Sequence, residues 1–287
     1  MHAPTSNVAE GTAEAHSREV AAGERFSFGK NWRVFIDGMS EDAIATAVDS
    51  LKSMLRRESL VGARFLDIGS GSGLFSLAAH RLGADVTSFD YDPDSVGCTQ
   101  ELRRRYATDS ATWRVMQGSV LDRAFLDTLG TYDVVYSWGV LHHTGAMWDA
   151  ISHAVDRVRP DGTLFIAIYN DQGVWSKRWT AIKKLYCSGL VGRCIVAGVA
   201  IPFWVASDFA KDIFWLRSPI TRYRTYGGNR GMSVVRDWFD WLGGYPFEVS
   251  TPEGLIFPLQ ARGFRLVNLV TAKGTVGCIE LVMTRGH

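Results

Sequence analysis

The chain has 287 residues, 46% of them hydrophobic, which is enough for one large domain or for a core with a sizeable insertion. Its formal net charge of +1 excludes a strongly basic nucleic-acid-binding chain. The four cysteines show no C-x-x-C or other metal-ligand spacing, so we expect no metal site, no disulfide framework and a cytoplasmic protein.

The N-terminal region divides into two parts. Residues 1–24 are rich in Ala, Ser, Thr, Gly and Glu and lack the apolar segment of a secretion signal, so we expect a flexible tail. Residues 25–60 are expected to form a lid and a helix. The pattern predicts this helix from about Asp42 to Arg57, with Ser40 as its N-cap.

A glycine-rich turn follows the first expected strand, residues 63–68. Gly69, Gly71 and Gly73 stand at alternate positions, and apolar residues with helical spacing continue from Leu74. This order of strand, tight turn and helix is typical of nucleotide-binding proteins. The G-x-G-x-x-G spacing of dinucleotide-binding dehydrogenases is absent, because Leu74 stands where the third glycine would be.

The motif Asp67-x-Gly69-x-Gly71-x-Gly73 resembles the first motif of class I S-adenosylmethionine-dependent methyltransferases. The resemblance implies S-adenosylmethionine as cofactor, S-adenosylhomocysteine as product and no metal. Glycines would let the backbone approach the ligand, and Asp67 would attract the ammonium group of its methionine tail. The residues assigned to this cofactor turn are Asp67, Gly69, Ser70, Gly71, Gly73 and Leu74. The alternative is a turn that only packs tightly.

Further strands alternate with helical segments, which predicts a parallel sheet with crossover helices. The expected strands are residues 63–68, 85–90, 112–117, 132–138 and 163–169. Residues 263–270 and 277–283 flank a Lys273–Gly274 turn and predict an antiparallel hairpin. The expected fold is therefore α/β, a Rossmann-like seven-stranded methyltransferase sheet, with its core in residues 61–171 and 251–287.

Ligands of open α/β sheets bind at the carboxyl ends of the strands. Asp90, which ends the second strand, can accept hydrogen bonds from both ribose hydroxyls, and Tyr91 is expected near the adenine. The family often has an acid after the third strand, but this chain has Ser119, so the adenine role passes to Ser119, the Val120 backbone or Asp122. The other residues assigned to the cofactor are Gly118 after the third strand, Ser137, Trp138 and Gly139 along the methionine part, and Phe28 and Trp32 in an aromatic lid.

The sequence Leu141-His142-His143 resembles that of methyltransferases in ubiquinone and menaquinone biosynthesis. A histidine with an ordinary pKa near 6.5 can accept a proton from an attacking hydroxyl. We expect His142 as the catalytic base or cofactor contact and His143 as second choice. Either one can instead be a packed or helix-capping residue.

Residues 172–250 interrupt the strand pattern and are expected to form a helical cap that binds the substrate. Residues 173–236 carry eleven Lys or Arg against two Asp, with ten aromatic residues interleaved. The alternative is a solvated helical face. Substrate contacts are expected at Tyr169 and Asn170, and in the aromatic segment 237–248 at Trp241 and Tyr245. The run from Cys194 to Ala206 is too short to cross a bilayer but apolar enough to lie against one.

We expect a methyltransferase that acts on a small or lipid-like acceptor, with oxygen as the favoured atom. The runner-up is a tRNA or RNA methyltransferase whose basic cap binds phosphates. The Asn-Pro-Pro-Tyr-like motif common in base-modifying enzymes is absent after the fourth strand, so nucleic acid is the less favoured partner. A third hypothesis is a cofactor-binding protein without catalysis. The sequence leaves the oligomeric state open.

Overall fold

The computed structural model describes residues 5–107, 110–215, 218 and 234–286. Its centre is a seven-stranded sheet of order β3-β2-β1-β4-β5-β7-β6. The strands are β1 (Arg64–Ile68), β2 (Asp85–Asp90), β3 (Trp113–Gln117), β4 (Tyr132–Trp138), β5 (Val158–Tyr169), β6 (Phe264–Val270) and β7 (Cys278–Arg285). β1 to β5 are parallel, and β7 runs antiparallel to β5 and β6. The expected α/β methyltransferase sheet is confirmed.

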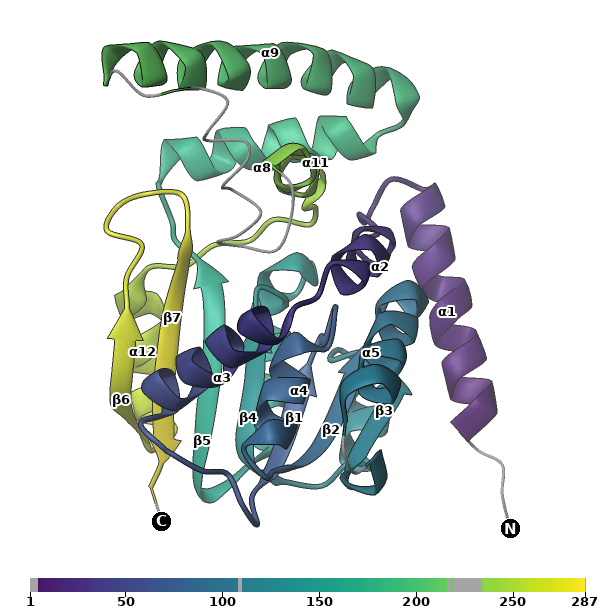
Figure 1. Cartoon of the computed structure of the whole chain (residues 1–287), viewed down its shortest axis with the longest axis vertical. Helices are drawn as coiled ribbons and strands as arrows, with labels where there is room; N and C mark the ends of the chain where they lie inside the picture. The colour runs from purple at the N-terminus through teal and green to yellow at the C-terminus, as the bar shows by residue number, and fades with distance from the viewer. Residues whose placement is uncertain (1–4, 108–109, 216–217, 219–233, 287) are drawn as a thin grey trace.

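Helices cover both faces of the sheet (Figure 1). They are α1 (Thr5–Ala21), α2 (Gly29–Asp37), α3 (Glu41–Leu55), α4 (Leu74–Arg81), α5 (Pro93–Tyr106), α6 (Arg123–Asp127), α7 (Met147–Asp156), α8 (Val174–Cys187), α9 (Leu190–Phe214), α11 (Val234–Gly243) and α12 (Pro252–Ala261). Short 3-10 helices are η1 (Ser110–Thr112) and η2 (Leu141–His143). α3, α4 and α5 pack on one face, and α6, α7 and α12 on the other.

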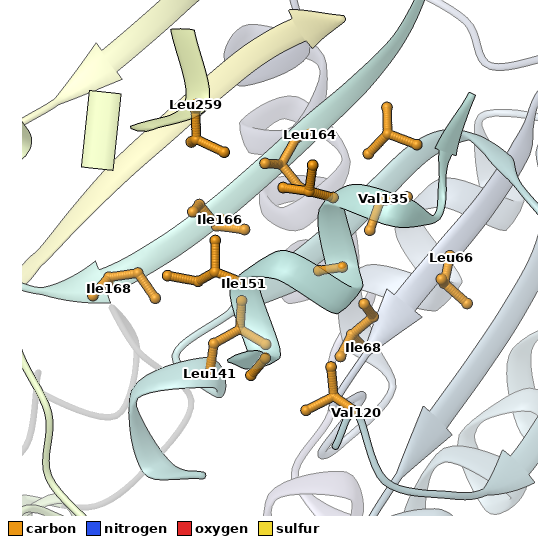
Figure 2. Close-up of a cluster of buried hydrophobic side chains, with 14 of the residues drawn as sticks. Leu66, Ile68, Val120, Val135, Leu141, Ile151, Leu164, Ile166, Ile168 and Leu259 are labelled. Carbon is orange, nitrogen blue, oxygen red and sulfur yellow. The ribbon is translucent and has the colours of Figure 1, made fainter. Parts of the chain in front are cut away.

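The two hydrophobic layers arise because successive strand residues point to opposite faces. In β1, Leu66 and Ile68 join one cluster, whereas Phe65 joins the other. Figure 2 shows the first cluster, in which Ile151 of α7 and Leu259 of α12 approach the strand side chains. Parallel strands buried on both faces need this nearly continuous apolar composition, and the layers fix the strand ends that carry the candidate site.

The expected flexible tail over residues 1–24 is wrong for Thr5–Ala21, which form helix α1. Tertiary contacts hold the end of this polar helix. Glu19 accepts a hydrogen bond from the Tyr91 hydroxyl at 3.0 Å and pairs with Arg25 at 2.7 Å. These partners lie far along the chain or in the next segment, so composition alone could not reveal the helix. Residues 1–4 lie outside the described part.

Helix α3 begins where the sequence predicted it. The Ser40 hydroxyl accepts a hydrogen bond from the Ala43 backbone N–H at 3.2 Å and so acts as the N-cap. An N-cap of this kind satisfies one of the unpaired N–H groups at a helix start.

We expect Ser40→Ala to lower the free energy of unfolding by about 1 kcal/mol, because the first turn of α3 loses its acceptor. Urea denaturation followed by circular dichroism measures the change. The matched control is Ser53→Ala, an exposed position in the same helix, where alanine has the better helix propensity and no loss is expected. Equal losses in both variants would contradict a capping role.

The described part of the predicted cap is helical, consisting of α8, α9 and α11. These helices lie beyond the carboxyl edge of the sheet, with α9 outermost (Figure 1). They share a small hydrophobic cluster of their own, which includes Tyr186, Val196 and Leu242. Residues 216–217 and 219–233 of the predicted cap lie outside the described residues.

The apolar run of the cap is longer than the sequence indicated. Instead of ending at Cys194 and Ala206, α9 spans 25 residues and is long and apolar enough to cross a membrane by length and composition. Charged Arg193 and Asp208 interrupt the sequence run but not the helix, since a helix continues through isolated charges. Of the 18-residue apolar stretch of α9 that meets this criterion, only 11% is buried inside the protein.

Candidate functional site

The carboxyl ends of β1, β2 and β4 meet at one edge of the sheet. β1 pairs with β2 on one side and with β4 on the other, so the strand order reverses between β1 and β4. Open α/β sheets bind their ligands at such a position. The turn after β1 has left-handed φ values of 78° at Gly69, 54° at Gly71 and 82° at Gly73, a conformation that glycine adopts without steric cost.

Asp90 lies directly beside this turn. One carboxylate oxygen accepts from the backbone N–H of Gly71 at 2.9 Å and the other from that of Asp92 at 2.9 Å. A carboxylate offers about four lone-pair positions, so Asp90 can still accept hydrogen bonds from two hydroxyls. Burial raises the pKa of Asp90 to about 6, which leaves the group mostly ionised at neutral pH.

Helix α2 covers the turn. The indole of Trp32 packs so closely on Gly71 that a Cβ there would lie 3.2 Å from the ring. Beside the turn, Gly139 has a φ of 73°, and no atom lies within 4 Å of a Cβ added there. Trp32 thus lies over the predicted cofactor turn. Phe28 does not lie over this turn. Its ring centre is 5.3 Å from the ring centre of His143.

Two predicted cofactor residues already have partners inside the protein. Asp67 is 2% exposed and accepts a hydrogen bond from the Ser76 hydroxyl at 2.5 Å. Burial raises the pKa of Asp67 to about 7. Ser137 is buried, and its hydroxyl donates to the Ile68 carbonyl at 2.9 Å. The expected contact of Asp67 with an ammonium group stays a prediction, and in the structure this carboxyl group is buried between β1 and α4.

At the expected adenine end, α1 and the segment that follows it supply contacts that the sequence did not suggest. The Arg25 guanidinium stands 4.9 Å above the ring of Tyr91, whose hydroxyl donates to Glu19. Among the alternatives after β3, the Ser119 hydroxyl accepts from a backbone N–H and Asp122 caps α6. The choice between Ser119, the Val120 backbone and Asp122 stays open. Gly118 is needed for packing, because a Cβ there would lie 2.2 Å from the ring of Phe125.

A family model described as a methyltransferase domain matches residues 39–191, more than half of the chain. The chain belongs to this methyltransferase family. The matched residues include the glycine turn, Asp90 and the His142–His143 pair. Its sheet of five parallel strands and an antiparallel hairpin is the one expected for the class I, S-adenosylmethionine-dependent members of this family.

Curated relatives match less than half of the chain. It is 34% identical over 137 residues to "Ubiquinone biosynthesis O-methyltransferase" of Xanthomonas campestris pv. campestris, covering 47% of this chain and 54% of the relative. It is 32% identical over 114 residues to the Sinorhizobium medicae protein of the same name, covering 40% of this chain and 44% of the relative. The chain thus spans about half the length of the curated relatives it matches.

The fold of the methyltransferase also resembles a solved structure, that of magnesium protoporphyrin IX methyltransferase from Synechocystis with bound S-adenosylhomocysteine. The TM-score is 0.50 at 16% sequence identity, and the match covers 90% of this chain and 94% of that one. At this identity the likeness shows the fold alone.

The residues at the β1–β4 junction fit S-adenosylmethionine. Asp90 offers a carboxylate to the ribose hydroxyls, and the left-handed turn with open Gly139 leaves backbone accessible to the nucleoside and the amino-acid tail. When bound, the cofactor supplies a methyl group on a positively charged sulfur. Among the described residues, no group of three His, Cys, Asp or Glu side chains is placed to hold a metal ion.

The two histidines of η2 differ in their hydrogen bonds. His142 is fully buried, its Nδ1 lies 3.4 Å from the Tyr169 backbone nitrogen, and the Ala167 backbone is a further hydrogen-bond partner of its ring. The other ring nitrogen of His142, Nε2, is buried without a hydrogen-bond partner among the described residues. His143 donates from Nδ1 to the Pro246 carbonyl at 2.6 Å, which leaves the lone pair on Nε2. The Pro246 carbonyl therefore fixes the tautomer of His143.

Burial lowers the pKa of both histidines. The pKa of His142 falls well below its usual value because of burial and of nearby His143 and Lys183. Burial lowers the pKa of His143 to about 3. Both imidazoles are neutral at physiological pH and both are weak bases, so the expected role of His142 as the base is not favoured by its environment.

An aromatic cluster joins the sheet edge to the cap. Tyr169 stands at the end of β5. Its ring centre lies 4.2 Å from the ring centre of His142, 5.4 Å from that of Trp241 and 5.2 Å from that of Phe247. Of the four predicted substrate residues, the structure brings Tyr169 and Trp241 together here. The Asn170 side chain points instead to the Thr275 carbonyl, at 3.5 Å, and Tyr245 packs in the cap cluster.

Sequence reasoning missed Lys183, which α8 places against this aromatic cluster. Its side chain is fully buried. The Nζ donates a hydrogen bond to the Trp241 carbonyl and stands 4.0 Å from the ring centre of Trp241 and 4.8 Å from that of Phe247. A signal was present in the sequence, because Trp179, Lys183 and Tyr186 recur at helical spacing and so share one face.

Burial lowers the pKa of Lys183 to about 7. Between this value and the unfolded value near 10.5, the unfolded chain holds a proton that the folded protein lacks, so raising the pH stabilises the fold. We expect this contribution to disappear in Lys183→Met. Urea unfolding of both proteins at pH 6.5 and pH 9.5 measures the difference, and exposed Lys184→Met is the control. A wild-type protein that gains no stability relative to Lys183→Met over this range would contradict the lowered pKa.

Proposed function

We propose that this methyltransferase transfers a methyl group to an oxygen atom of a small, amphiphilic acceptor that binds at the aromatic cluster. The observation that carries the proposal is the position of this cluster, between the carboxyl ends of β4 and β5 and the helical cap. The rings of Tyr169, Trp241 and Phe247 offer apolar faces to a flat acceptor. The names of the two curated relatives, both O-methyltransferases, support oxygen as the acceptor atom.

The protein's contribution to such a reaction is mainly alignment. Attack on a methyl group requires the acceptor oxygen in line at roughly 3 to 3.5 Å, and the enzyme must also take the proton that the hydroxyl loses. Trp32 over the glycine turn and Phe28 beside His143 place the N-terminal segment over both parts of the site. This cover supports a reaction from which water is excluded.

Methyl-labelled S-adenosylmethionine tests the proposal. The purified protein is incubated in parallel with lipid extract, soluble metabolites, RNA and protein from the source cells. We expect the label in a small organic-extractable product that resists mild alkaline hydrolysis, as a methyl ether does. Label that appears only in RNA or in protein would contradict a small-molecule acceptor, and label in an alkali-labile methyl ester would contradict a hydroxyl group as the acceptor.

We also propose that α9 rests on a lipid surface, from which the cap receives a lipid-like acceptor. Its exposed apolar side chains are Leu190, Val191, Ile195, Val199, Phe203, Val205, Phe209, Ile213 and Phe214. Several recur at intervals of four residues and form a stripe along the helix. Exposed Arg193 adds positive charge near the N-terminal end of the helix, which favours anionic lipids. The four free cysteines support a reducing, cytoplasmic side for this contact.

We expect the wild-type protein to float with vesicles of phosphatidylcholine and phosphatidylglycerol. The double variant Val199→Glu with Phe203→Glu should stay with the soluble fraction, because two charges then enter the apolar stripe. The matched control is Val61→Glu, an 80% exposed apolar residue far from α9, which should float as the wild type does. Flotation of the double variant, or none of the wild type, would contradict the proposal.

A further inference from the structure

Lys183 is a buried amine with few partners. Its Nζ donates to one backbone carbonyl, that of Trp241, and no acidic side chain in the described part of the chain forms an ion pair with it. Burying a charged amine without a counter-ion is unfavourable. The rings of Trp241 and Phe247 compensate only in part through their π faces. The site therefore suits a ligand that brings a negative charge.

The surroundings of Lys183 connect it with the histidines. A Cβ on Gly244 would lie 3.4 Å from the Lys183 Nζ and 3.0 Å from the His143 Cε1, so both side chains stand against the same glycine. The ionisable groups that face Lys183 are His142 and His143 from η2 and Cys187 from its own helix. None of these is an anion at neutral pH, because both imidazoles are neutral and burial raises the pKa of the Cys187 thiol.

We propose that Lys183 takes the proton of the acceptor hydroxyl and holds the oxyanion that results. This role rests on the proposed function, since it places the acceptor against Trp241 and Phe247. The hydroxyl O–H bond breaks as the amine forms its third N–H bond, and the product is an ammonium–oxyanion pair of unchanged total charge. After the methyl group has reached the oxygen, the ammonium returns its proton to water.

The lowered pKa of Lys183 supports this role, because an amine that titrates near 7 can accept a proton at physiological pH. His143 is less suited, since its burial leaves it a much weaker base. Its Nε2 lone pair can still accept a hydrogen bond from the Lys183 ammonium or from the acceptor. His143 is then a positioning residue beside Lys183.

The test uses 4-nitrocatechol, a hydroxyarene whose absorption shifts when it ionises, with protein saturated with S-adenosylhomocysteine. We expect the wild type to bind the ionised form at least tenfold more tightly than the neutral form, and to lower the apparent pKa of the bound dye by at least one unit. Lys183→Met should lose this preference. Lys184→Met, which removes an exposed lysine from the adjacent position, should behave as the wild type does. Circular dichroism confirms folding, and Lys183→Gln replaces the methionine variant if that one does not fold.

A second readout needs no variant. In protein with ¹⁵N-labelled lysine side chains, one ε-nitrogen should titrate near pH 7, and 4-nitrocatechol should raise its midpoint. An unchanged midpoint, an equal preference in Lys183→Met, or no binding of the ionised dye by the wild type would overturn the role of Lys183. Failure of the proposed function is distinguishable, because it would appear as absent labelling of any small molecule while these lysine and dye measurements remain as expected.

Discussion

Replacing Asp90 with asparagine is expected to weaken binding of S-adenosylhomocysteine about 100-fold. Asparagine keeps the shape and one acceptor oxygen but loses the charge, so the hydrogen bonds from the ribose hydroxyls are no longer charge-assisted. Hydrogen bonds to charged groups contribute about 1.5 to 3 kcal/mol each, and a loss of about 2.7 kcal/mol corresponds to 100-fold in affinity. Isothermal titration calorimetry measures the affinity.

The matched control for Asp90 is Asp85→Asn. Asp85 is exposed at the opposite end of the same strand, so its replacement should leave the affinity unchanged. The substitution at Asp90 also disturbs the bonds from the Gly71 and Asp92 N–H groups, and a melting curve records any loss of stability. Unchanged affinity in a folded Asp90→Asn protein would remove Asp90 from the cofactor site.

Gly71→Val is expected to abolish measurable binding of S-adenosylhomocysteine. The left-handed φ of 54° strains any residue with a Cβ, and the added Cβ would lie 3.2 Å from the Trp32 indole. The branched side chain must therefore displace either the turn or the lid, and both line the predicted cofactor site. Calorimetry on the folded variant measures the loss.

A control variant at a second glycine distinguishes the effect of backbone strain from the effect of a side chain placed in the cofactor site. Gly130 has a φ of 75° and no atom within 4 Å of an added Cβ, so Gly130→Val carries the same kind of backbone strain, of about 1 to 2 kcal/mol, far from the site. Both variants should lose stability, and only Gly71→Val should lose the ligand. Equal binding in both would mean that the turn does not approach the ligand.

The core of the fold follows from local sequence signals. The alternation of apolar strands and helical segments predicted the five parallel strands, and β2 and β4 begin and end at the predicted residues. β5 begins earlier than predicted, at Val158, because Arg159, Pro160 and Asp161 interrupt the apolar run while the backbone continues as strand. Capping of α3 by Ser40 was also predictable, because this side chain bonds within its own turn.

The sequence predicted only part of the candidate site. The glycine spacing and the acid at the end of β2 identified the cofactor edge, because topology brings these strand ends together whatever the side chains do. The hydrogen-bond partners of the individual side chains could not be predicted from the sequence. Asp67 and Ser137 face buried neighbours, and the nitrogen that His143 presents depends on a backbone carbonyl 103 residues away.

The sequence by itself determined the sheet, the turn after β1 and the methyltransferase family, because these depend on patterns within a few residues and on the order of elements. Only the tertiary structure decided which of two adjacent lysines is buried, why a polar N-terminal segment is helical, and how α9 stands exposed. Those outcomes depend on packing between distant segments. Burial then sets the charge of Lys183 and His143, since a group's pKa reflects the solvent and the neighbours that folding leaves around it.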